Sequence, residues 1–120
     1  MIAMIEFELP FPPSVNHYYR RVGPRTLISR EGRAFREKVC SIVAAAGIQP
    51  QAGPLQVEIE LYPPDRRRRD LDNSLKALLD ALEHAGAYHD DSQIVRLEIE
   101  KYEPFRDGLA VVHIIGSDSC

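Results

Sequence analysis

Four consecutive arginines stand directly before two closely spaced aspartates in this chain. Arg66–Arg69 are followed by Asp70 and Asp72, with Asn73 and Lys76 shortly after them. Guanidinium groups bind phosphate oxygens through paired hydrogen bonds, whereas neighbouring carboxylates bind hard cations such as Mg²⁺. The segment therefore combines groups suited to phosphate with groups suited to a metal ion, which favours cutting a phosphate ester over binding alone.

The two aspartates also have an ordinary explanation as helix-capping residues. The leucines that follow recur at helical spacing and predict a helix from Leu71 to near Gly86, with Asp70 as its N-cap. On a regular helix, Asp70 and Asp72 point about 200° apart and cannot share a cation, although a non-helical Asp70 can turn back toward Asp72. Spacing alone favours capping, and a metal site needs another carboxylate, for which Asp91 in the loop after the helix is the candidate.

The basic residues of this segment likewise have two interpretations. Lys76 lies four residues after Asp72, which suits a helical ion pair, but it is also placed to neutralise charge that builds up on a phosphate. Arg66–Arg69 can be a solvated charge run. Because four adjacent like charges repel one another, they need a compensating anion, and phosphate or the nearby aspartates can supply it.

Composition predicts one soluble domain spanning residues 1–120. The chain has 120 residues, 44% of them hydrophobic, and no apolar run near the roughly 20 residues of a membrane span. We expect a cytoplasmic protein with no membrane partner. The net charge of −3 argues against nucleic acid at first, but residues 1–69 hold 11 Lys/Arg and 7 Asp/Glu, whereas residues 70–120 hold 4 and 11. One region can therefore meet phosphate and the other a metal ion.

Apolar residues alternate with polar ones over residues 5–9, 55–61 and 95–99, which predicts three strands, and the apolar run 109–115 predicts a fourth. The glutamates between these apolar residues indicate the solvated face of a half-buried sheet. With the two helices, the order is β-α-β-α-β-β. We expect an α/β domain in which a mixed sheet packs against two helices, and the last two strands look like a hairpin.

The remaining helix and the first long connection complete this outline. Ser29 is a plausible N-cap for a helix that stops at Gly47. Residues 14–28 have no clear periodicity and carry several arginines, so we interpret them as a long basic loop, a type of segment that is often functional. The four histidines lack zinc-ligand spacing, and no nucleophile motif is visible, so a metal-activated water is the favoured mechanism.

Several ordered segments resemble the RusA family of Holliday junction resolvases, and the resemblance runs nearly from end to end. These segments are Pro12-Pro13-Ser14-Val15-Asn16-His17-Tyr18-Tyr19-Arg20, Pro64-Asp65-Arg66-Arg67-Arg68-Arg69-Asp70-Leu71-Asp72-Asn73, Lys76, Asp80-Ala81 and Asp90-Asp91-Ser92-Gln93-Ile94. The resemblance favours the metal-binding interpretation of the aspartates over the capping one.

The resemblance implies a homodimeric, Mg²⁺-dependent endonuclease that cuts two opposed strands of a four-way DNA junction symmetrically. It implies one or two ions per subunit, with Mn²⁺ as a possible substitute, held by Asp70, Asp72 and Asp91, and it makes Lys76 catalytic. Of the arginines, we expect Arg69 nearest the scissile phosphate. The residues expected to contact DNA are Arg66, Arg67, Arg68, Arg69, Asn73, Asn16, Tyr18, Arg20, Arg21 and Arg25.

Two other functions fit the residues. In the first, a non-catalytic protein binds DNA junctions through its arginines, and the aspartates only cap the helix. In the second, a metal-dependent phosphohydrolase acts on nucleotides and has no preference for branched DNA.

Overall fold

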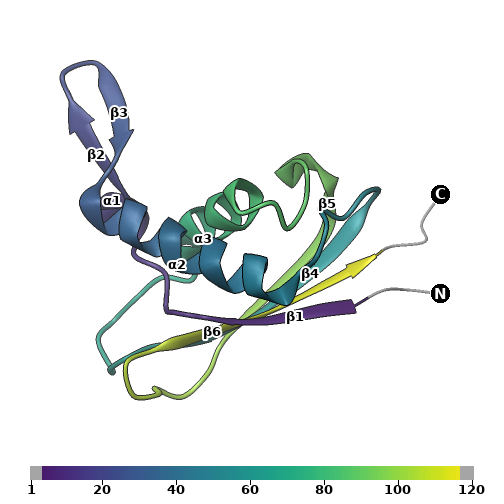
Figure 1. Ribbon diagram of the computed structural model, residues 1–120. Helices are drawn as coiled ribbons and strands as arrows, with labels where there is room; N and C mark the ends of the chain where they lie inside the picture. Colours follow the sequence, from purple (N-terminus) through teal and green to yellow (C-terminus); the bar gives the residue numbers. More distant parts are fainter. Residues whose placement is uncertain (1–3, 117–120) are drawn as a thin grey trace.

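Two long helices cover one face of a four-stranded sheet (Figure 1). The computed structural model describes residues 4–116, so the ends of the predicted domain lie outside the described residues. The strands are β1 (Met4–Leu9), β4 (Leu55–Tyr62), β5 (Ile94–Lys101) and β6 (Leu109–Gly116), in the order β1-β6-β4-β5. β6 runs antiparallel to both of its neighbours and β5 runs parallel to β4, so the predicted mixed sheet is confirmed.

Helix α2 (Arg30–Ala46) begins and ends as its sequence predicts. The Ser29 Oγ accepts a hydrogen bond from the Gly32 N–H at 2.9 Å, which satisfies one of the free amides of the first turn. Gly47 ends the helix in the left-handed conformation, with φ of 67°, which a glycine adopts without steric cost.

The core lies between the sheet and the two helices. Phe35 and Val39 of α2 and Leu78 of α3 (Asp72–His84) are buried against alternate residues of the strands, such as Val57 and Ile59. Each fully buried side chain of this size stabilises the fold by roughly 1.5–3 kcal/mol. The intervening strand glutamates are exposed or half-buried, which confirms the predicted solvated face. No helix in residues 4–116 is long and apolar enough to cross a membrane.

The predicted long basic loop is instead a short helix followed by a β-hairpin. Residues 15–28 form α1 (Val15–Tyr18), β2 (Tyr19–Val22) and β3 (Arg25–Ile28), and the hairpin projects away from the sheet (Figure 1). The loop prediction was wrong because every residue from Arg20 to Leu27 is exposed, and an exposed hairpin needs no alternation of polar and apolar residues.

The predicted pairing of the last two strands was also wrong. β5 and β6 are not adjacent in the sheet, because β4 lies between them and pairs with both. α3 carries the chain from the end of β4 back to the start of β5, which makes that pair parallel. The final connection then crosses to the far side of β4. The strand order depends on pairing between residues distant in the sequence, so local sequence patterns do not predict it.

The third correction concerns the start of α3. The helix begins at Asp72, and Leu71 occupies the cap position with helical angles (φ −59°, ψ −41°) and no side-chain capping bond. Asp70 is therefore not the N-cap. Its backbone carbonyl accepts a hydrogen bond from the Asn73 N–H at 3.3 Å, which turns the chain into the helix and leaves the Asp70 carboxylate outside the helix end. The helix ends at His84, close to the predicted stop at Gly86.

Candidate active site

Asp65, directly before the arginine run, holds two of its residues through hydrogen bonds. The Asp65 Oδ1 accepts hydrogen bonds from the Arg67 N–H at 2.9 Å and from the Arg69 Nη1 at 2.8 Å, and these two bonds hold the pKa of Asp65 below its ordinary value. The Arg69 guanidinium carbon also lies 5.6 Å from the centre of the Phe11 ring. Lys101 Nζ donates to the Arg69 carbonyl at 3.0 Å, which attaches the run to the last residue of β5.

A cleft of about 330 Å³ lies between this run and the segment after β1. Its lining consists of Phe11, Pro12, Pro13, Ser14, His17, Arg67, Arg68, Arg69, Asn73 and Ser74. Asn73 and Ser74 belong to the first turn of α3, where the positive end of the helix dipole favours an anion. The cleft therefore joins three predicted arginines to a helix N-terminus, an arrangement suited to a phosphate group.

A second hollow, of about 480 Å³, lies beside the first two arginines of the run, Arg66 and Arg67. It is lined by Pro63, Asp65, Arg66, Arg67, Lys101, Tyr102, Glu103 and Pro104. Arg66 faces this side and forms an ion pair with Glu103 at 3.3 Å between Nη2 and Oε2, with both side chains more than 80% exposed. Arg67 therefore lines both hollows, whereas Arg66 lines only this one and Arg68 lines only the cleft.

Asp91 is held by a tightly bonded loop after α3. Asp91 begins the short helix η1 (Asp91–Gln93), and the Asp90 carboxylate caps that helix by accepting from the Ser92 N–H at 2.8 Å. That bond keeps the pKa of Asp90 below its ordinary value. Gln93 accepts from the backbone of His89 and Asp90 and donates to the carbonyls of two residues before β4, at 2.8–2.9 Å in each case.

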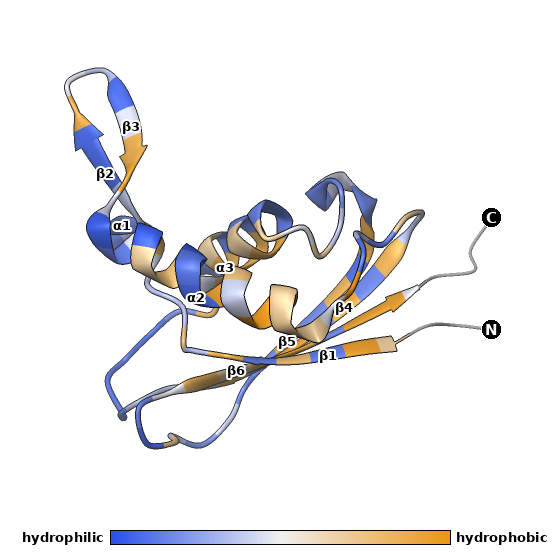
Figure 2. Ribbon diagram, in the orientation of Figure 1, coloured by the Kyte–Doolittle hydropathy of each residue, from blue (hydrophilic) through white to orange (hydrophobic). Residues whose placement is uncertain are grey.

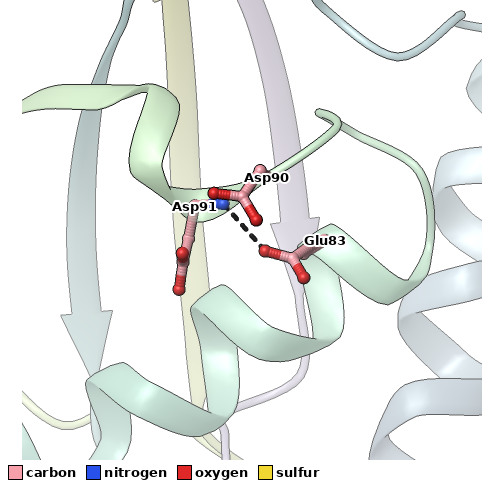
Figure 3. A group of neighbouring side chains, drawn as sticks. All are labelled: Glu83, Asp90 and Asp91. Atoms are coloured by element: carbon pink, nitrogen blue, oxygen red, sulfur yellow. Dashed lines mark hydrogen bonds between the residues drawn. The ribbon is translucent and has the colours of Figure 1, made fainter.

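Asp91 also lies beside the last turn of α3 (Figure 3). Its backbone N–H donates to Glu83 Oε1 at 2.8 Å. Oxygens of Glu83, Asp90 and Asp91 lie within 4.8 Å of one another, and within residues 4–116 this is the one group of three or more acidic, histidine or cysteine ligands so close together. Carboxylate oxygens are the donors that hard divalent cations prefer, so the chemistry of the group fits such an ion.

The three predicted aspartates are not gathered within one chain. Asp72 and Glu83 are 11 residues apart on α3, which separates them by about 16 Å along the helix axis. Asp70 follows Arg69, which is bonded to the last residue of β5, whereas Asp91 precedes the first residue of that strand. Asp70 and Asp72 therefore lie at one end of α3, and Asp91 lies at the other.

Lys76 is exposed on α3, one turn after Asp72 and one turn before Asp80. Its Nζ lies 5.8 Å from the centre of the Tyr19 ring, at the base of the hairpin. Tyr18, which we expected to contact DNA, is fully buried, and its hydroxyl donates to Asp80. The other expected DNA contacts outside the arginine run are exposed: Asn16, Arg20, Arg21, Arg25 and Asn73.

Sequence reasoning missed several residues that shape the site. The spacing Asp90-x-x-Gln93 is a capping-box signature, so the ordered loop at Asp91 was open to prediction. Asp65 stands just before the arginine run, but nothing in the sequence distinguishes its role from that of a solvated charge. Glu83 carries no signal at all, because its approach to Asp91 depends on how the chain returns from α3 to β5.

The fold and site together define a small α/β protein with an arginine-lined anion cleft and exposed carboxylates at both ends of one helix. The chain belongs to the endodeoxyribonuclease RusA family, whose model matches residues 10–114. It is 46% identical over 101 residues to the crossover junction endodeoxyribonuclease RusA of Escherichia coli K12 and to that of Enterobacteria phage 82. It is 44% identical to the protein of E. coli O139:H28. In each case the match covers 83% of this chain and 84% of the relative.

Proposed function

We propose that this protein is a structure-specific endonuclease that resolves four-way DNA junctions by Mg²⁺-dependent, symmetric phosphodiester hydrolysis. Membership of the family and the names of the relatives support the class of substrate and reaction. The observation that carries the proposal is the cleft at the N-terminus of α3, where Arg67, Arg68 and Arg69 lie directly before Asp70 and Asp72.

The residues at this end of α3 have complementary tasks. The arginines bind the phosphate and fix its orientation, and the positive end of the helix dipole favours its charge. The exposed carboxylates of Asp70 and Asp72 hold the divalent cation, with Mn²⁺ as a possible substitute for Mg²⁺. Once bound, that cation supplies an activated water and stabilises the leaving oxygen. Lys76, one turn further along α3, neutralises the charge that develops on the phosphate.

A second copy of the chain supplies the remaining carboxylate. If the twofold axis lies perpendicular to α3, the two copies of the helix run antiparallel. The Asp91 end of one α3 then comes to the Asp70 and Asp72 end of the other, and two identical sites form. β5 is an edge strand with exposed apolar residues, Val95 at 59% and Leu97 at 37%, which offer a surface for this contact. A homodimer of this kind has one site for each of the two strands that are cut.

Cleavage of labelled four-way, three-way and duplex DNA, with Mg²⁺ or with EDTA, tests the proposal. We expect paired cuts in the four-way junction with Mg²⁺ only, and at least about a hundredfold slower cutting by Asp72→Asn, with junction binding retained. Glu8→Gln, an exposed carboxylate on β1 at the opposite edge of the sheet, is the matched control and should cut normally. Equal cutting by the wild type and Asp72→Asn contradicts the metal-binding role. Turnover of a small phosphate ester without junction preference supports a nucleotide phosphohydrolase instead.

A further inference from the structure

One face of the projecting hairpin interleaves arginines with exposed apolar side chains. Arg20 pairs with Leu27 and Val22 pairs with Arg25 across the two strands. Since residues two apart on a strand share a face, these four side chains lie on the same side of the hairpin. Val22 is 42% exposed and Leu27 is 40% exposed. Figure 2 shows hydrophilic and hydrophobic segments following one another along both strands.

The charge of the hairpin indicates the chemistry of the partner that this face binds. Residues 14–30 contain no aspartate or glutamate, so the segment is purely cationic. A partner must therefore carry negative charge and, between its charges, apolar surface that Val22 and Leu27 can cover. Nucleic acid has both, because its phosphates alternate with the flat faces of the bases.

The hairpin is firmly attached to the body at its base. The Tyr18 carbonyl, just before β2, accepts hydrogen bonds from the Ser29 N–H at 2.9 Å and from the Ser29 Oγ at 3.0 Å, just after β3. The chain passes so close to α2 there that a Cβ at Gly32 would collide with the Tyr18 carbonyl oxygen. An isolated two-stranded hairpin is only marginally stable, so this base allows it to project as a defined element.

We infer that the face formed by Arg20, Val22, Arg25 and Leu27 is a wedge that enters the branch point of the DNA junction. Its two apolar side chains contact the faces of bases, and its two arginines bind the flanking phosphates. Proteins that separate base steps use apolar wedges beside basic residues in this way. The base stack is already interrupted at a branch point, so insertion costs less there than in a duplex. This inference rests on the proposed function and accounts for a preference for branched DNA.

The test uses 2-aminopurine placed beside the branch point, whose fluorescence rises when the base is unstacked, with EDTA present to prevent cleavage. Wild type should raise the fluorescence, and Val22→Ser/Leu27→Ser should not. The double variant should bind the junction about tenfold more weakly, a change of about 1.4 kcal/mol, and duplex within about twofold of wild type, since the apolar contacts with bases are lost at the junction only. Met4→Ser, another exposed apolar residue, at 64%, is the matched control and should behave as wild type. Arg20→Ala/Arg25→Ala should weaken binding to both DNAs.

The possible failures are distinguishable. A double variant that keeps both the fluorescence rise and the junction preference overturns the wedge alone. A double variant whose sedimentation shows a changed oligomeric state also overturns it, because the face would then contact a second copy of this chain. A wild-type protein that neither prefers nor cuts junctions overturns the proposed function and the wedge with it.

Discussion

Arg36 of α2 and Asp80 of α3 form an ion pair of 2.6 Å between Nη2 and Oδ2, and both also bond to the hydroxyl of the buried Tyr18. The Arg36 Nε donates to that hydroxyl at 2.7 Å. The three side chains connect α1, and with it the base of the hairpin, to both long helices. Burial alone would raise the pKa of Asp80, but the hydrogen bonds from Tyr18 and Arg36 and the charge of Arg36 outweigh it and hold the pKa below its ordinary value of 3.8.

Replacing Asp80 should therefore destabilise the fold in a pH-dependent way. Asp80→Asn should lower the free energy of unfolding at pH 7 by about 2 kcal/mol, because the hydrogen bonds from Tyr18 and Arg36 lose their charged acceptor and the half-buried Arg36 loses its counter-charge. A carboxyl with a depressed folded-state pKa contributes stability above its unfolded pKa, and loses it as the pH falls through the folded value. Denaturant unfolding at pH 7 and pH 3 measures the free energy of unfolding of both proteins. The difference between wild type and Asp80→Asn should be smaller at pH 3.

The control for this change is Glu103→Gln, which removes an exposed ion pair with Arg66. It should alter stability by no more than about 0.5 kcal/mol at either pH. If wild type and Asp80→Asn differ in their free energy of unfolding as much at pH 3 as at pH 7, the charge of Asp80 does not stabilise this network.

Gln93→Ala should release the loop that holds Asp91. The Gln93 side chain accepts two backbone hydrogen bonds and donates two, and their loss should lower the free energy of unfolding by about 2 kcal/mol. Junction cleavage should fall while junction binding stays unchanged, because the DNA-contacting arginines lie elsewhere. Gln93→Glu keeps the accepting oxygen but cannot donate to the two carbonyls, so it should also destabilise the loop. Full cleavage activity in Gln93→Ala would show that Asp91 needs no ordered loop.

Elements with local signals were predictable from the sequence. Ser29 and Gly47 mark the ends of α2 through side-chain capping and a left-handed turn, both of which are properties of a few neighbouring residues. The hairpin had one local signal that we did not use, the Gly23-Pro24 pair at its turn. The predicted start of α3 was one residue early: Leu71 has helical angles but occupies the cap position, and no side chain there makes a capping bond that would mark the boundary.

The features that the sequence did not predict depend on contacts between residues distant in the sequence. The strand order was missed because β4 pairs with both β5 and β6, and no local pattern reveals which strands become neighbours. The cluster around Asp91 needed Glu83, whose position follows from the return of the chain after α3. The residues proposed for catalysis were identifiable by type and by family resemblance, but their separation along α3 became visible only in the fold.

Arg68→Ala should weaken DNA binding in a salt-dependent manner. Arg68 is exposed beside the cleft, and within residues 4–116 its guanidinium forms no ion pair with an acidic residue, so it is free to meet a phosphate. Losing one phosphate contact should reduce the slope of log affinity against log salt by about 1. Titrations from low to moderate salt measure this slope, with Lys38→Ala on α2 as the control. An unchanged slope in Arg68→Ala would exclude the phosphate contact.

Mixing two inactive variants tests the shared site most directly. Asp72→Asn and Asp91→Asn should each fail to cut a labelled four-way junction with Mg²⁺, since each homodimer lacks a carboxylate in both sites. In a mixed dimer, one site carries both substitutions and the other carries neither. The mixture should therefore regain cutting, as nicks in one strand instead of paired cuts. A mixture as inactive as its separate components would place all three aspartates in one chain's site, and cutting by either variant alone would contradict their role in catalysis.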